Sequence, residues 1–110
     1  MKPKAPYYAV IFTSVRTQVQ EGYAKMAEDM MQLAAQQPGY MGVEHARDQQ
    51  VGITVSYWAS LEAISAWKNE TDHLLAQALG KSTWYSQYRV RICKVEREYA
   101  FIDTPNNEVS

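Results

Sequence analysis

The spacing of apolar residues switches several times between the pattern of a strand and that of a helix. The order of these switches is the sequence feature that most constrains the fold. Residues 7–14 form an unbroken apolar run rich in β-branched and aromatic side chains, which is typical of a strand covered on both faces. Residues 21–37 change to helical spacing, with an apolar face made of Tyr23, Met26, Ala27, Met30, Leu33 and Ala34. Pro38 and Gly39 end this helix, because proline cannot continue it and glycine accepts the turn.

A hairpin is predicted after the first helix. The side chains of residues 40–48 alternate, with Met41, Val43, His45 and Arg47 expected on one face and Gly42, Glu44 and Ala46 on the other. Three polar residues, 48–50, then lead into a second strand-like run at residues 51–58. Two strands this close in sequence can pair only in the antiparallel direction.

A second helix and a last strand complete the pattern. Ser60 is a good N-cap, and the acidic Glu62 in the first turn suits the positive end of the helix dipole. Asn69 is expected to interrupt this helix and to cap a second helical piece that ends at Gly80. Residues 85–100 are predicted to form the last strand, in which Tyr88, Val90 and Ile92 alternate with Arg89, Arg91 and Cys93.

The order β-α-β-β-α-β predicts an α+β chain with the ferredoxin-like, split βαβ fold, a four-stranded antiparallel sheet with both helices on one face. The strands carry apolar residues on both faces, although the helices can cover only one. We therefore expect a homodimer whose sheet-to-sheet interface buries more than roughly 1,200 Å² in total. Residues 1–6 are expected to be a flexible arm, residues 7–100 the domain, and residues 101–110 a polar tail.

Charge and composition argue against several classes of protein. Lys and Arg number 11 against 12 Asp and Glu, so a strongly basic nucleic-acid binder is not expected. RNA-binding sheets of this topology place aromatic rings where this chain has Ile53 and Val55. No apolar stretch approaches the roughly 20 residues that cross a bilayer. The single cysteine, Cys93, excludes a disulfide within the chain and fits a cytoplasmic location, which we expect.

The sequence lacks the common catalytic and cofactor motifs. It contains neither a glycine-rich phosphate cradle nor the GxSxG turn of a serine hydrolase. The two histidines, His45 and His73, do not have the spacing of a metal-binding motif. We therefore expect no metal and no other cofactor.

Aromatic side chains gather in the second half of the chain. If the second helix packs on the sheet, their rings can surround one pocket that suits a flat, aromatic, partly polar ligand. The candidate substrate-binding residues are Tyr57, Trp67, Trp84, Tyr85, Tyr88 and His45. His73, six residues after Trp67, is the candidate catalytic base, since a neutral imidazole beside phenols is a usable base near neutral pH.

Each candidate also has an ordinary structural interpretation. Trp67 can belong to the core, and Trp84 and Tyr85 can close one end of the sheet. His73 can be a surface residue of the helix. His45 is more readily a structural histidine than a catalytic one.

The ordered motifs resemble the antibiotic biosynthesis monooxygenase (ABM) superfamily over residues 7–99. The resemblance is carried by Tyr57-Trp58-x-Ser60-x-Glu62-Ala63-x-x-x-Trp67, His73, Gly80, Trp84-Tyr85-x-x-Tyr88 and Val95-Glu96-Arg97, with Pro38-Gly39-Tyr40 before the second strand. It implies a dimeric α+β barrel with a separate pocket in each protomer. Members include cofactor-independent monooxygenases for phenolic or quinol-type substrates, haem-degrading monooxygenases and isomerases.

Departures from the family pattern narrow the range of activities that we expect. The haem-degrading branch has its ligating histidine ten residues after the helix tryptophan, where this chain has Gln77, so haem degradation is not expected. In the phenol-oxidising branch a tyrosine can occupy the position of His73. That branch also has an asparagine four residues before the helix tryptophan, where this chain has Ala63. We expect a cofactor-independent monooxygenase-like enzyme for a small aromatic, phenolic or quinol substrate. The alternative is a non-catalytic dimeric domain that binds a metabolite in the same pocket.

Overall fold

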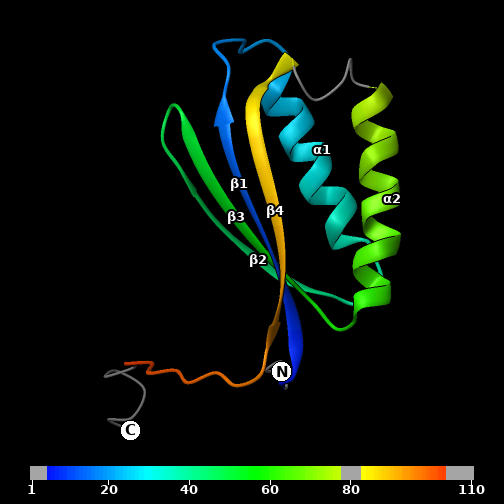
Figure 1. Ribbon diagram of the computed structural model, residues 1–110, viewed down its shortest axis with the longest axis vertical. Coiled ribbons are helices and arrows are strands. Elements are labelled where there is room, and N and C mark those ends of the chain that lie inside the picture. The colour runs from blue at the N-terminus through cyan, green and yellow to red at the C-terminus, as the bar shows by residue number, and fades with distance from the viewer. Residues whose placement is uncertain (1–4, 78–82, 104–110) are drawn as a thin grey trace, which may run out of the picture.

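The computed structural model describes residues 5–77 and 83–103. Along the chain it contains β1 (Tyr7–Arg16), α1 (Tyr23–Ala35), β2 (Tyr40–Arg47), β3 (Val51–Trp58), α2 (Leu61–Gln77) and β4 (Tyr85–Val95). The strands form one antiparallel sheet in the order β2-β3-β1-β4, and both helices lie on the same side of it (Figure 1). The predicted ferredoxin-like α+β fold is confirmed. No helix in these described ranges is long and apolar enough to span a bilayer.

Strand pairing divides the sheet into two faces, which we call the helix face and the open face. Residues paired across neighbouring strands share a face, and successive residues alternate between faces. On the central strands β1 and β3 the helix face carries Tyr8, Val10, Phe12, Ser14, Gly52, Thr54, Ser56 and Trp58. The open face carries Tyr7, Ala9, Ile11, Thr13, Val15, Val51, Ile53, Val55 and Tyr57.

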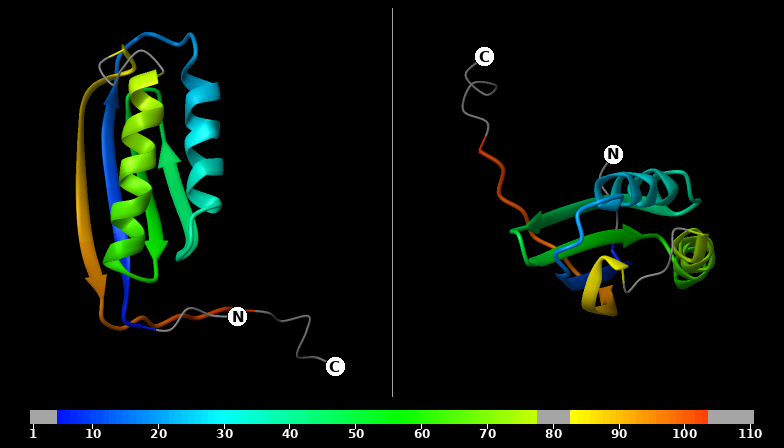
Figure 2. Two further views of the ribbon diagram at one scale, coloured as in Figure 1. Left: turned by 90° about the vertical axis from the view of Figure 1, so that its right-hand side faces the viewer. Right: turned by 90° about the horizontal axis from the view of Figure 1, so that it is seen from above.

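The main core lies between the helix face and the two helices. Val10, Ala34, Trp58 and Ile64 form its buried centre, and Trp58 is completely inaccessible to solvent. The helices do not cover the whole sheet, because β4 lies beyond the edge of α2 (Figure 2). As a result, Val90 and Ile92 on the helix face of β4 stay about half exposed, at 47% and 51%.

The second helix is continuous, so the predicted interruption at Asn69 is wrong. Ser60 caps the helix as expected, since its Oγ accepts a hydrogen bond from the backbone N–H of Ala63 at 3.1 Å. Beyond it, Lys68 and Asp72 form an ion pair of 2.8 Å that spans Asn69 on the surface of the helix. Tertiary packing and this pair outweigh the modest helix propensity of asparagine. The predicted end at Gly80 lies outside the described residues.

A bulge in β2 overturns the predicted placement of Met41. The register between β2 and β3 shifts between Tyr40 and Gly42, and Gly42 has a φ of 147°. Val43, His45 and Arg47 therefore share one face, as predicted, and this is the helix face. Met41 lines a pocket on the open face instead. A bulge adds one residue to one strand of a pair, which a simple alternation cannot reveal.

The last strand ends earlier than predicted. Its ladder with β1 stops at Val95, and residues 96–103 continue without regular secondary structure. The predicted alternation within the strand is confirmed, with Tyr88, Val90 and Ile92 on the helix face.

Candidate functional site

A stack of aromatic rings forms the wall between α2 and the sheet. The Trp67 ring lies on the Trp58 ring at a centroid distance of 4.8 Å and an interplanar angle of 27°. Tyr40 meets the other side of this group edge-on, 5.5 Å from Trp58. The indole N–H of Trp58 donates to Ser56 Oγ at 2.8 Å, which satisfies its only polar atom.

Among the side chains that the structure describes, two buried polar atoms on the same side of α2 have no hydrogen-bond partner. They are Nε1 of Trp67 and Oγ1 of Thr71. The two residues are four positions apart, so they lie one above the other on one face of the helix. Buried donors are nearly always paired in native proteins, and an unpaired one calls for an explanation such as a missing ligand atom. This pair is the feature that marks the helix side as a candidate site.

A second aromatic group lies near the other end of the helix face. Phe12 on β1 contacts Tyr88 at 5.3 Å and Tyr85 at 5.6 Å between ring centroids. Tyr23 of α1 meets Tyr85 edge-on at 6.1 Å. Burial, followed by the neighbouring Tyr23 phenol, raises the pKa of Tyr85, so its hydroxyl stays protonated at physiological pH.

Two guanidinium groups border this second aromatic group. Arg16 lies over the Tyr23 ring, 3.3 Å from its centroid, and Arg47 lies 5.8 Å from the same centroid. Arg47 reaches this place by crossing Gly52, where a Cβ would stand only 2.2 Å from the guanidinium. Its Nη2 then donates to Ser14 Oγ at 2.9 Å. Arg47 was expected only to share a face with Val43 and His45, and it was not among the candidate site residues.

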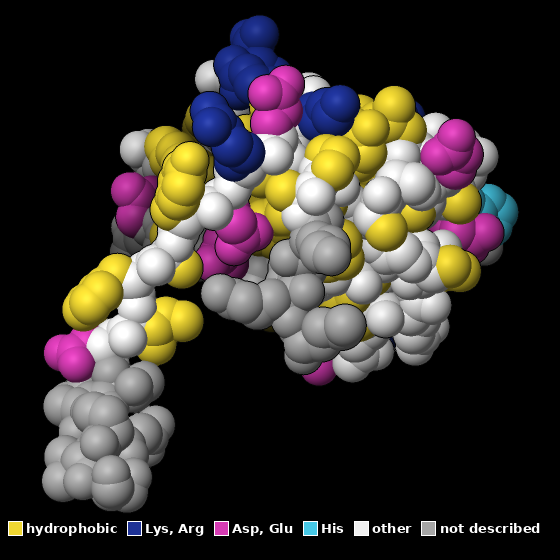
Figure 3. All heavy atoms as spheres, turned by 90° about the horizontal axis from the view of Figure 1, so that it is seen from below, with side chains coloured by type: hydrophobic (Ala, Val, Ile, Leu, Met, Phe, Trp, Pro, Cys, Tyr) yellow, Lys and Arg dark blue, Asp and Glu magenta, His cyan; other side chains and the backbone are white. Residues whose placement is uncertain are grey.

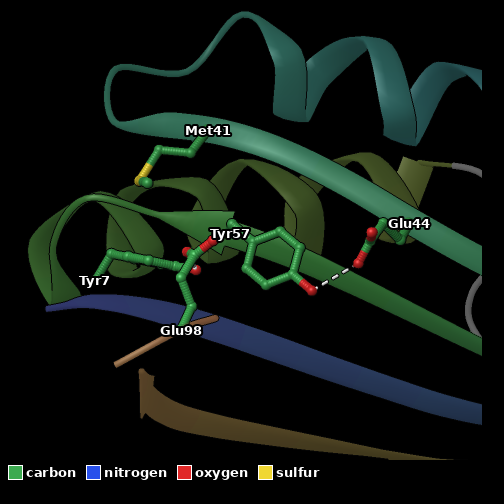
Figure 4. Close-up of a pocket in the computed structure, with 5 residues that line it drawn as sticks. All are labelled: Tyr7, Met41, Glu44, Tyr57 and Glu98. Atoms are coloured by element: carbon green, nitrogen blue, oxygen red, sulfur yellow. Dashed lines mark hydrogen bonds between the residues drawn. The ribbon is translucent and has the colours of Figure 1, made fainter. Parts of the chain in front are cut away.

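Tyr57 is separated from the other candidates because it lies on the open face. Its hydroxyl donates to Glu44 Oε1 at 2.7 Å, and this hydrogen bond is the main reason why its pKa rises to about 12. Tyr7 donates in the same way to Glu98, which raises the pKa of Tyr7. With Met41 these residues line a pocket of about 220 Å³ (Figure 4).

The remaining candidates lie at the edges of the site or in the core. His45 and His73 are both exposed side chains. Trp84 is 3% exposed and packs against Met26, while its indole N–H donates to the carbonyl of Glu21 at 2.9 Å. The position of Trp84 also explains Gly22, where a Cβ would stand 3.2 Å from the indole. Trp67 thus lies in one aromatic group on the helix side of the sheet, and Tyr85 and Tyr88 lie in a second, separate group on the same side. Tyr57 lies on the opposite face.

Phe12, Tyr23 and Thr71 were missed by the sequence analysis. Phe12 belongs to the apolar run of β1, where nothing in the sequence separates it from core residues. Thr71 follows Trp67 at helical spacing. Whether its hydroxyl has a hydrogen-bond partner depends on which atoms of other elements lie near it in the fold, and the sequence does not show this. Within residues 5–77 and 83–103, no group of three or more His, Cys, Asp or Glu side chains could hold a metal ion.

Comparison with known proteins gives a sequence relative that matches almost the whole chain and solved structures of the same fold. The chain is 48% identical to the uncharacterized protein YqjZ of Bacillus subtilis (strain 168) over 106 residues, which cover 96% of this chain and 93% of that protein. SnoaB, a cofactor-independent oxygenase from Streptomyces nogalater, superposes with a TM-score of 0.70 at 10% identity. The matched region covers 86% of this chain and 97% of SnoaB.

A protein of unknown function from Nitrosomonas europaea, NE2512, has the same fold. Its TM-score is 0.68 at 13% identity, over 89% of this chain and 97% of that chain. The sequence profile of the family described as antibiotic biosynthesis monooxygenase matches residues 6–79, which is more than half of the chain. The chain therefore belongs to the antibiotic biosynthesis monooxygenase family.

Proposed function

We propose that this protein is a cofactor-independent monooxygenase-like enzyme that oxidises a small aromatic, phenolic or quinol-type substrate with O₂. The substrate would bind on the helix face, beside Trp67 and Thr71. The observation that carries this proposal is the pair of buried, unpartnered donors on α2, set among aromatic rings. Family membership supports the class of reaction.

The two donors suit the oxygen atom of a phenol or an enol. A phenolate oxygen that accepts hydrogen bonds from the indole N–H and the hydroxyl is stabilised relative to the neutral phenol, so the pKa of the bound substrate falls. The resulting anion is electron-rich and can transfer an electron to O₂ directly. In a conversion of CH₂ to C=O, one oxygen atom enters the product and the other leaves as water, and the substrate supplies all four electrons.

The aromatic side chains provide the rest of the binding surface. Trp67 offers an indole already held by its stack on Trp58, so little rotamer freedom is lost when a flat ligand binds. Phe12 and Tyr88, 5.3 Å apart, form a further ring surface on the same face of the sheet. Exclusion of water by these rings when a substrate is bound would keep a reactive carbanion from being reprotonated by solvent.

The role of His73 as the base stays a prediction. Its side chain is exposed, and the helix break that was expected to turn it toward the pocket is absent. Stabilisation of the anion by Trp67 and Thr71 requires no imidazole, so His73→Ala separates the two mechanisms. If His73 is the base, this variant loses about 10²- to 10⁴-fold in turnover.

Oxygen uptake with a panel of quinols and anthrone-type phenols, without added cofactor, tests the proposal. Thr71→Val and Trp67→Phe each remove one unpaired donor and keep most of the side-chain volume. We expect each to lower kcat/KM by about tenfold or more, which corresponds to about 1.4 kcal/mol of transition-state stabilisation.

Trp84→Phe is the matched control, because it removes an indole N–H that already has the Glu21 carbonyl as its partner. It is expected to leave kcat/KM unchanged in protein that remains folded. Equal activities of wild type, Thr71→Val and Trp67→Phe on every oxidised substrate would refute the proposed site.

A non-catalytic binding domain is the second candidate, and one observation favours it. Both histidines of the chain are exposed, so neither lies buried against the unpaired donors as a ready base. This candidate predicts that a phenol binds with an affinity that depends on Thr71 while no oxygen is consumed. In either case we propose a homodimer whose protomers meet through their open faces, as the apolar residues of that face suggest.

A further inference from the structure

Four residues form one row across the helix face of the sheet, at the end where β1 stops and β4 begins (Figure 1). In the order of the strands, the row contains Arg47 of β2, Gly52 of β3, Ser14 of β1 and Tyr88 of β4. Neighbouring strands lie about 4.8 Å apart. The Arg47 side chain follows this row inward over Gly52, so its guanidinium ends at Ser14, one strand short of Tyr88.

Gly52 leaves the space for this path. A Cβ at this position would overlap Nη2 of Arg47. Gly52 lies within a regular strand and is not among the glycines with a positive φ, so the absence of a side chain, and not backbone freedom, is what the site uses. The hydrogen bond from Nη2 to Ser14 Oγ, at 2.9 Å, then holds the guanidinium in place, and Ser14 is only 3% exposed.

Arg16 brings a second positive charge to the same place, and we call Arg16 and Arg47 the arginine pair. The Arg16 guanidinium lies 3.3 Å from the centroid of the Tyr23 ring, and that of Arg47 lies 5.8 Å from the same centroid. Arg16 is held by hydrogen bonds from Nε to the carbonyl of Trp84 and from Nη2 to the carbonyl of Val19. Two guanidinium groups fixed around one ring repel each other, and an anion in contact with both would remove this cost.

The charge of the arginine pair is not balanced by an ion pair with any carboxylate in the described ranges 5–77 and 83–103. The acid next to Arg47 in sequence, Asp48, is engaged in the hairpin turn. Its Oδ1 accepts hydrogen bonds from the backbone N–H groups of Gln50 and Val51, each at 2.7 Å. Two arginines without an acidic partner are suited to bind a carboxylate, whose two oxygens match the planar guanidinium.

Aromatic rings lie beside the arginine pair. Tyr88, the neighbour of Ser14 in the row, is 37% exposed. Its ring centroid lies 5.3 Å from that of Phe12 and 6.0 Å from that of Tyr85. A flat ring that packs against Tyr88 can therefore carry a charged substituent that reaches the arginine pair.

We propose that the arginine pair and the neighbouring rings form a binding site for an aromatic carboxylate. The carboxylate lies on the guanidinium groups of Arg16 and Arg47, and the ring of the ligand packs against Tyr88. Because both guanidinium groups are already held by hydrogen bonds, little side-chain freedom is lost when the ligand binds.

This site is separate from the one proposed beside Trp67 and Thr71. Trp67 stacks on Trp58, and the stretch of β3 from Gly52 to Trp58 spans about 20 Å. The inference therefore goes beyond the proposed function, because it assigns a second site and concerns binding alone.

Calorimetric titration with 2-naphthoate tests the proposal. We expect saturable binding of one molecule per chain. The amide 2-naphthamide has the same rings and no charge, so it should bind at least tenfold more weakly. Arg16→Gln and Arg47→Gln should each raise the Kd for 2-naphthoate at least tenfold, since each removes a charged donor.

Gly52→Ala tests the path of Arg47 without removing a donor. The added methyl group should displace the guanidinium from Ser14 and raise the Kd at least tenfold in protein whose circular dichroism shows that it is folded. Arg97→Gln is the matched control, because it makes the same change of charge beyond the opposite end of β4. Lys and Arg side chains are also exposed at that end of the molecule (Figure 3), and Arg97→Gln should leave the Kd unchanged.

Three results would each overturn the proposal. They are the absence of saturable 2-naphthoate binding, equal affinities for 2-naphthoate and 2-naphthamide, and an unchanged Kd in either arginine variant. Inorganic phosphate is the arm of the experiment that carries charge and no ring. Displacement of 2-naphthoate by phosphate at equal concentration would refute the assignment of an aromatic ligand. None of these measurements involves oxygen or turnover, so failure here is distinct from failure of the proposed function.

Discussion

At the scale of single residues, two polar side-chain atoms of α2 are buried without a partner in the described part of the protein. A buried donor without a partner typically costs about 1–3 kcal/mol in desolvation. Trp58 and Trp84 show how the fold satisfies an indole N–H when it is purely structural, through Ser56 and the Glu21 carbonyl respectively. The unpaired N–H of Trp67 and hydroxyl of Thr71 depart from that pattern, as expected of groups that await a ligand atom.

This interpretation makes an unusual prediction for Thr71→Val. Valine has nearly the same shape and no hydroxyl to desolvate, so the variant should gain about 1 kcal/mol in the free energy of unfolding. Urea denaturation followed by fluorescence measures this change. A loss of more than about 1 kcal/mol would mean that the hydroxyl is satisfied in the apo protein and is not reserved for a ligand.

Tyr57 provides a test of the open-face contacts. Its pKa is raised from about 10 to about 12, chiefly by the hydrogen bond to Glu44. Its contribution to stability is therefore fully present below pH 10 and is lost as the pH rises toward 12. Glu44→Gln removes the negative charge and should bring the pKa of Tyr57 back toward 10.

Ultraviolet titration of tyrosinate checks this prediction by difference. The high-pH phase assigned to Tyr57 should vanish in Tyr57→Phe and move to lower pH in Glu44→Gln. The same curve for wild type and Glu44→Gln would show that the carboxylate does not hold the phenol.

At the scale of elements, the sequence predicted those features that depend on residues close together in the chain. The strand at residues 51–58 and the helix cap at Ser60 both match the structure. The Asn69 interruption failed because a long-range packing face outweighed a weak local preference. Met41 was misplaced because a bulge changes the alternation, and only the pairing with β3 reveals it.

The candidate site was predictable in part. Tyr57 and Trp58 are adjacent in one strand, so alternation alone places them on opposite faces, and this signal was available in the sequence. The unpaired state of Thr71 was not available, because it depends on which atoms the fold places around the hydroxyl. The sequence therefore points to the aromatic residues Trp67 and Tyr88 but not to the unpaired hydroxyl of Thr71.

The connection between α1 and β2 yields a prediction at the same scale. Gly39 has a φ of 88°, and a Cβ there would stand 2.6 Å from the Cβ of Ala63 in α2. Gly39→Ala should therefore destabilise the protein by about 2 kcal/mol or more, through both backbone strain and the clash.

A double-mutant cycle separates the strain from the clash. Ala63→Gly alone should cost about 1 kcal/mol, as glycine does within a helix. The double variant Gly39→Ala/Ala63→Gly should be more stable than the sum of the two single changes, because the clash is gone. Additive changes in the urea midpoint would show that the two elements do not press on each other at this point.

At the scale of the whole molecule, the two faces of the sheet carry different kinds of side chains. The helix face carries the buried donors and the aromatic rings of the proposed site. The open face carries the exposed apolar side chains Val51 and Ile53.

The most direct test of the central claim is to locate a bound phenol by ¹⁹F NMR of protein labelled with 5-fluorotryptophan. The chain has three tryptophans, and Trp67→Phe and Trp84→Phe assign their signals. Titration with an anthrone-type phenol that binds by calorimetry should shift the Trp67 signal at the calorimetric stoichiometry and leave the Trp84 signal in place. Saturable binding that leaves the Trp67 signal unmoved would contradict the account.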